Sequence, residues 1–100
     1  MVVYLADQDT DDMPELYRVP FATPGVSTKL NSPLVSNGEV SSFVVFVTPV
    51  GTAVVYTADQ DTDTVVELYR VPFATPGVST KLNGPLVPGG DVKGVQVIVP

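Results

Sequence analysis

The sequence contains no cysteine, no histidine and no tryptophan. Without cysteine there is no disulfide scaffold and no thiol nucleophile, and without histidine there is no imidazole base and no zinc site of the His/Cys type. Basic residues are also few: 5 Lys and Arg stand against 11 Asp and Glu, for a formal net charge of −6. Because affinity for nucleic acids rests largely on basic side chains that neutralise phosphates, this balance argues against a nucleic-acid partner.

Long hydrophobic runs are missing as well. Apolar runs such as residues 43–47 are far short of the span of a bilayer, and the N-terminus has no basic segment of the signal-peptide type. We therefore expect a soluble chain without membrane insertion, and the sequence gives no indication of its compartment.

The dominant feature that is present is an internal repeat. Residues 2–48 align with residues 54–100 at a constant offset of 52, and 33 of the 47 aligned pairs are identical. Such self-similarity indicates a duplicated structural unit. At 100 residues the chain has room for one domain, 1–100, with repeat 1 at about 2–53 and repeat 2 at about 54–100.

Each period contains four strand candidates. In the second period these are residues 54–58, 67–71, 79–83 and 92–99, and residues 40–47 correspond to the last of them in the first copy. Val, Tyr and Phe fill these segments, and Pro, Gly, Asn and Asp lie between them, which is typical of strands joined by turns. The sequence therefore predicts an all-β fold built from two tandem four-stranded antiparallel repeats.

The residues also carry a family resemblance. The pattern Ala-Asp-x-Asp followed by Glu-Leu-Tyr, at residues 6–17 and 58–69, resembles the TolB-like (PD40-type) β-propeller repeat. The family's Ser-Pro-Asp-Gly turn is altered here, because residues 48–51 read Thr-Pro-Val-Gly. The resemblance implies that each repeat is a propeller blade, and the period agrees with the length of such blades.

The phase of the repeat predicts self-association. If residues 40–47 are the innermost strand of a blade, the chain supplies three strands of one blade, four of the next, and then a lone innermost strand at 92–99. Propellers have roughly four to eight blades, so two blades cannot close a ring. We expect a homo-oligomer that closes by strand exchange, and the six blades that the resemblance favours make it a trimer.

Other arrangements of the same strands stay open. The chain could be an excerpt of a longer propeller or a deliberate construction, since near-identical repeats fit either origin. The repeats could also form a strand-swapped dimer or a two-sheet sandwich, because identical edges invite alternative pairing.

Acidic residues cluster in both repeats and are the only candidate metal ligands. Carboxylates at alternate positions can converge on a hard cation such as calcium. The sites so predicted are Asp7, Asp9, Asp11, Asp59, Asp61 and Asp63. The pattern departs from the EF-hand loop, whose sixth position is Gly and whose twelfth is Glu, so the competing interpretation is a solvated hairpin loop whose aspartates accept backbone hydrogen bonds.

Catalysis is not expected. No Ser-His-Asp triad exists without histidine, and no phosphate-binding loop is present. The arginines, Arg18 and Arg70, are expected to pair with Glu15, Glu67 or an aspartate of a neighbouring blade. We therefore predict a non-catalytic structural or interaction module that presents its loops to a protein or a glycan, without a required cofactor. The alternative is a calcium- or glycan-binding, lectin-like propeller that uses the acidic hairpins.

Overall fold

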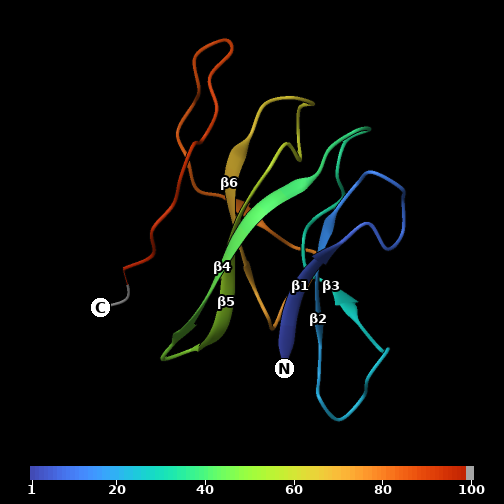
Figure 1. The fold of residues 1–100 in the computed structure, drawn as a ribbon. Helices are drawn as coiled ribbons and strands as arrows, with labels where there is room; N and C mark the ends of the chain where they lie inside the picture. Colours follow the sequence, from blue (N-terminus) through green and yellow to red (C-terminus); the bar gives the residue numbers. More distant parts are fainter. Residues whose placement is uncertain (99–100) are drawn as a thin grey trace.

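The computed structural model describes residues 1–98, which form two antiparallel sheets that face each other (Figure 1). Sheet A has three strands and sheet B has four, and these residues contain no helix. The prediction of an all-β, antiparallel fold is confirmed. Within the same range there is no helix of the length and apolarity needed to cross a membrane.

Sheet A is formed by the first repeat. Its strands are β1 (Val2–Ala6), β2 (Glu15–Val19) and β3 (Thr28–Lys29), in that spatial order. Tyr4 lies opposite Tyr17 in the β1–β2 register, and the two rings stack with their centroids 5.5 Å apart. Antiparallel neighbours of this kind bring facing side chains into contact and fix the register. The outer edge of β1 has no partner strand within residues 1–98.

Sheet B repeats this arrangement and adds one strand. Its order is β4 (Val40–Thr48), β5 (Gly51–Ala58), β6 (Glu67–Pro72) and β7 (Thr80–Lys81). Strands β5, β6 and β7 correspond to β1, β2 and β3 of the first repeat, and the ring pair recurs as Tyr56 on Tyr69 at 5.4 Å. The additional strand β4 covers the edge of β5 that corresponds to the open edge of β1.

Two of the expected strands differ from the structure. The segment 79–83 shortens to β7, because Asn83 turns its side chain back to accept a hydrogen bond from the Leu68 amide. The expected strand 92–99 does not form: residues 92–98 belong to neither sheet, and Val99 lies outside the described residues. The physical reason is that β4 already occupies the edge of β5, so the sheet nearest to this segment has no inner edge left.

The core lies between the two sheets. Leu16 and Leu30 of the sheet A side pack with Tyr56, Tyr69 and their neighbours from sheet B in one buried cluster, which also contains Val40, Val54, Ala58 and Val71. One face of each sheet is thereby covered. Within residues 1–98 no further strand lies over the opposite face of either sheet, although Tyr17 on that face of sheet A and Val55 on that face of sheet B are buried.

Residues that the duplication makes equivalent therefore differ in burial. Leu30 is 0% exposed and its counterpart Leu82 is 47% exposed, while Val54 is 0% exposed and its counterpart Val2 is 42% exposed. Residues 15–31 and 67–83 are identical, so for the two leucines it is tertiary position that causes the difference. Val2 and Leu82 thus place exposed apolar side chains on the outer sides of the two sheets.

Candidate functional site

The acidic loops lie between the first two strands of each repeat, at residues 7–14 and 59–66, and a lysine holds each of them to its sheet. Lys29 Nζ lies 2.6 Å from Asp9 Oδ2 and 2.9 Å from Glu15 Oε1. Lys81 repeats this geometry with Asp61 at 3.1 Å and Glu67 at 3.0 Å. One cation bridges a strand carboxylate and a loop carboxylate, so it fixes the loop against the strand.

An asparagine completes each lysine cluster, buried at Asn31 and half-buried at Asn83. Asn31 Oδ1 accepts a hydrogen bond of 2.8 Å from the Leu16 amide, and its Nδ2 donates to Glu15 Oε2 at 3.1 Å. Asn83 makes the corresponding bonds to Leu68 and Glu67, at 2.8 and 3.4 Å. Buried polar groups need such partners, because an unpaired one costs about 1–3 kcal/mol. The carboxylates of the Glu-Leu-Tyr strands are therefore structural.

Two other aspartates shape the loops through backbone bonds. Asp7 Oδ2 accepts from the Asp12 amide at 3.4 Å, and Asp59 Oδ2 accepts from the Thr64 amide at 3.1 Å. Asp12 and Thr64 have positive φ values of 58° and 66°. Aspartate side chains commonly stabilise turns of this kind by accepting nearby backbone hydrogens. The interpretation of the acidic stretches as hydrogen-bonded hairpin loops describes these four residues well.

Asp59 has a second role that Asp7 lacks. Its Oδ1 accepts a 2.7 Å hydrogen bond from the amide of Glu39, in the segment that leads from sheet A to β4. The Asp59 amide in turn donates to the Glu39 carbonyl at 3.3 Å. The second acidic loop is therefore tied to the connection between the sheets, whereas Asp7 Oδ1 has no such partner among residues 1–98.

The six candidate metal ligands do not all come together. Asp7, Asp11 and Asp12 place carboxylate oxygens within 4.8 Å of one another on an exposed surface. Asp9 and Asp61 instead contact the lysines, and Asp63 lies exposed on the second loop. Sequence reasoning missed Asp12, whose counterpart in the second repeat is Thr64, so the exposed cluster belongs to the first repeat. The cation site stays a prediction.

The charges in these clusters shift several pKa values. The hydrogen bond from Lys29 lowers the pKa of Asp9. Burial alone lowers the pKa of Lys29, but its bonds to Asp9 and Glu15 outweigh burial and raise it above its ordinary value. Bonds to Glu67 and then Asp61 raise the pKa of Lys81. Burial raises the pKa of the phenols of Tyr17, Tyr56 and Tyr69.

We expect the free energy of unfolding to fall at alkaline pH. Tyrosine and lysine ordinarily titrate at 10.0 and 10.5, and the folded chain holds these protons more tightly than the unfolded chain does. A raised folded pKa gives stability that is complete below the unfolded pKa and is lost as pH rises toward the folded pKa. Urea midpoints measured from neutral pH upward should therefore decline from about pH 10. A urea midpoint that stays constant well above that pH would show that the folded chain does not hold the tyrosine and lysine protons more tightly than the unfolded chain.

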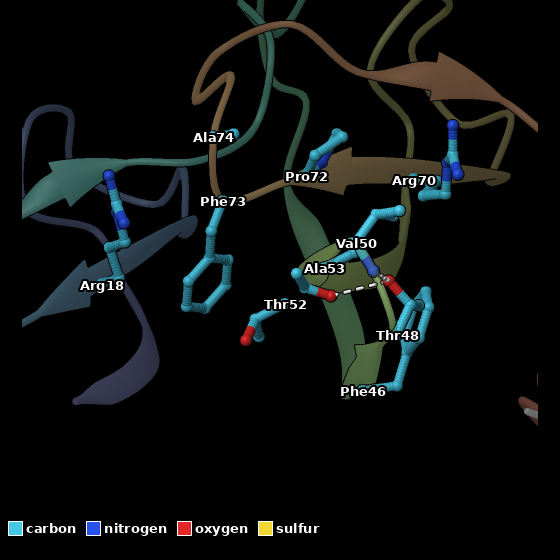
Figure 2. Close-up of a pocket in the computed structure, with 11 residues that line it drawn as sticks. Arg18, Phe46, Thr48, Val50, Thr52, Ala53, Arg70, Pro72, Phe73 and Ala74 are labelled. Atoms are coloured by element: carbon cyan, nitrogen blue, oxygen red, sulfur yellow. Dashed lines mark hydrogen bonds between the residues drawn. The ribbon is translucent and has the colours of Figure 1, made fainter.

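A cleft of about 530 Å³ lies around the end of the β4–β5 hairpin, with Arg18 of sheet A at one side of it (Figure 2). Its walls include Arg18, Arg70, Thr48 and Thr52, with Phe46 and Phe73 as the aromatic residues. The Arg18 guanidinium lies over the Phe73 ring at 5.3 Å from its centroid. The expected pairing of Arg18 with Glu15 is wrong, because Lys29 occupies that carboxylate and Arg18 instead makes a cation–π contact across the two sheets.

Figure 2 shows that the two arginines do not converge. Arg18 points upward from sheet A beside Phe73, and Arg70 lies at the far side of the β5–β6 pair. They lie on opposite sides of sheet B, because Arg70 shares the face of its register partner Val55, whereas Phe73, which Arg18 contacts, continues the face of Val71. One small anion therefore does not bridge them. Arg18 acts across the interface between the sheets.

No family model, no curated protein and no solved structure matches this chain. Function is therefore argued from the geometry of the chain itself. Within residues 1–98, the outer edge of β1 has no partner strand and segment 92–98 joins neither sheet.

Proposed function

We propose that the chain is a non-catalytic module that self-associates: a two-blade β-propeller unit whose copies close into a ring. The observation that carries this proposal is the difference in burial between equivalent residues. Leu82 and Val2 occupy the outer faces, while their counterparts Leu30 and Val54 lie in the core between the sheets. Burying apolar surface stabilises by about 25 cal/mol per Å², and a second copy is the simplest way to bury both outer faces at once.

The order of the strands supports the same proposal. Sheet A lacks the strand that β4 provides to sheet B, and the segment 92–98 is the sequence counterpart of β4 without a sheet. An open edge and an unpaired strand-like segment in one chain favour exchange between copies. With two blades from each chain, the six-bladed ring that the TolB-like resemblance favours is a trimer.

The acidic loops support a structural role better than a catalytic one. The buried carboxylates of Glu15 and Glu67 are neutralised by Lys29 and Lys81. General acid–base work needs a carboxyl group in reach of a substrate, and these lie beneath the loops that they anchor. The exposed ends of the same loops are the surface that a ring would present repeatedly to a protein or glycan ligand.

The test of this proposal is the absolute mass in solution. Light scattering after size exclusion should give three times the chain mass of 10.6 kDa. The variant Leu82→Glu should lower the mass to that of one chain, because it places a charge on the face that a second copy covers. The matched control Val50→Glu adds the same charge to a side chain 97% exposed at the hairpin and should leave the mass unchanged. A single-chain mass for the unaltered protein at high concentration would overturn the proposal.

A further inference from the structure

The contact between the two sheets within one chain provides a template for a contact between two copies. The connection from sheet A to sheet B begins β4 with a hydrogen bond from the Val40 amide to the Pro14 carbonyl, 2.9 Å long. The same bond recurs one repeat later, from the Val92 amide to the Val66 carbonyl, at 2.8 Å. Residues 92–98 therefore leave sheet B in the direction in which β4 leaves sheet A.

Resting on the proposed self-association, we infer that residues 92–98 pair with β1 of a second copy, in the register that β4 has on β5. In that register Val44 lies opposite Val55 and Val45 opposite Val54. Gln96 and Val97 are the repeat equivalents of Val44 and Val45, and Val3 and Val2 are those of Val55 and Val54. The same register therefore places Gln96 opposite Val3, and Val97 opposite Val2, of the second copy. The two copies then stack head to tail, with the outer face of sheet B against the outer face of sheet A.

A cation–π contact supports this docking independently. Within the chain, Arg18 of sheet A lies over Phe73 of sheet B. The repeat turns this contact into Arg70 over Phe21 of the second copy. Phe21 is 79% exposed, and Arg70 is exposed with no acidic partner among residues 1–98. One docking geometry thus provides partners for an exposed aromatic ring and for an arginine.

Backbone groups fit the same geometry. Between the sheets, the Val35 amide donates to the Gln60 carbonyl at 2.9 Å, and the Gly77 amide donates to the Leu30 carbonyl at 2.9 Å. By the repeat offset, the Val87 amide would donate to the Gln8 carbonyl of the second copy. The Gly25 amide of the second copy would donate to the Leu82 carbonyl. These main-chain bonds lie outside the strands and would join the connecting loops of the two copies.

One set of contacts is not reproduced. Ser32 bonds across the sheets to the Gly77 carbonyl at 3.0 Å, to the Ser79 amide at 2.9 Å and to the Ser79 hydroxyl at 2.7 Å. Its counterpart in the second repeat is Gly84, which has no side chain to make these bonds. The contact between copies is therefore weaker at this point than the contact between the sheets of one chain.

The partner of β1 is a second copy rather than the same chain. Figure 1 shows segment 92–98 on the side of sheet B that faces away from β1, so that sheet B separates the two. The segment would have to pass around sheet B and break the Val92–Val66 bond to reach its own β1.

Disulfide trapping tests the register directly, because the chain has no cysteine of its own. Val2→Cys and Val97→Cys are prepared as separate single variants, the second with a mass tag, and are mixed and oxidised gently. Directly opposed residues of an antiparallel pair have Cα atoms about 4.5–5.5 Å apart, within disulfide range. We expect a mixed disulfide between the two variants in high yield. The control is Val2→Cys with tagged Gln96→Cys, one residue out of register and on the opposite face, which should give little.

The outcomes separate this inference from the proposed function. If light scattering shows an assembly but the Val2–Val97 mixture cross-links no better than the Val2–Gln96 mixture, self-association stands and the register is overturned. If the chain is monomeric and neither mixture cross-links, both are overturned. A double variant that carries both cysteines and cross-links only within one chain would show that the segment reaches its own β1, which also overturns the inference.

Discussion

Replacing Tyr56 with alanine is expected to lower the free energy of unfolding by about 3–5 kcal/mol, the usual cost of removing a large buried aromatic side chain. Tyr56 is 0% exposed, stacks on Tyr69 and donates its hydroxyl hydrogen to Gln60 in the buried layer between the sheets. The substitution removes the ring, leaves a cavity in the core and deprives Gln60 of a partner. Urea unfolding followed by far-ultraviolet circular dichroism measures the loss.

The matched control is Tyr4→Ala in the first repeat. Tyr4 stacks on Tyr17 and donates to Gln8 in the same way, but it lies on the outer face of sheet A and is only half-buried. In dilute solution Tyr4→Ala should therefore cost less than Tyr56→Ala. At concentrations where the chain assembles, the second copy covers Tyr4, and the two losses should become similar. Equal losses at every concentration would show that the two sites do not differ in burial as described.

The second large effect is expected at the connection between the sheets. Gly38 is buried, and a Cβ added there would lie 2.6 Å from the Asp59 carbonyl oxygen and 3.0 Å from the Val35 carbonyl oxygen. Both obstacles are backbone atoms, so Gly38→Ala must push the second acidic loop away from the connection. The bonds between Glu39 and Asp59 stretch with it. We expect a loss of about 1–3 kcal/mol in the free energy of unfolding, as for other overpacked sites.

Gly90 is the counterpart of Gly38 and provides the control. A Cβ at Gly90 meets the Val87 carbonyl oxygen at 3.0 Å, as Gly38 meets Val35, but its three nearest atoms all belong to Val87 and none to an aspartate. Gly90→Ala should therefore destabilise the single chain less. In the docking inferred here the carbonyl of Asp7 from the second copy takes the place of Asp59, so Gly90→Ala should lower the solution mass instead. If Gly90→Ala destabilises the isolated chain as much as Gly38→Ala does, the clash with Asp59 is not the cause.

Much of the fold follows from local pattern. The segments 54–58 and 67–71 match β5 and β6 closely, because alternating Val and Tyr between Asp- and Pro-rich stretches leaves few other local conformations. The acidic loops were expected as hairpins, and Asp7 and Asp59 do accept backbone bonds there. The anchoring lysines were not foreseen, because Lys29 lies 20 residues from Asp9 and only the β2–β3 pairing brings them together.

The repeated sequence by itself indicated the first two strands of each repeat and the acidic loop between them. Only the tertiary structure decided which copy of each residue is buried. Leu30 and Leu82 sit in identical local sequence, yet one lies between two sheets and the other on an outer face. Strand β4 finds an open edge and segment 92–98 does not, but here the sequences differ as well, since residues 40–46 and 92–98 share only two identical pairs, Val40 with Val92 and Val45 with Val97. Burial and strand pairing depend on what lies opposite a residue in space. Two near-identical copies of a sequence do not specify which of them has such a neighbour.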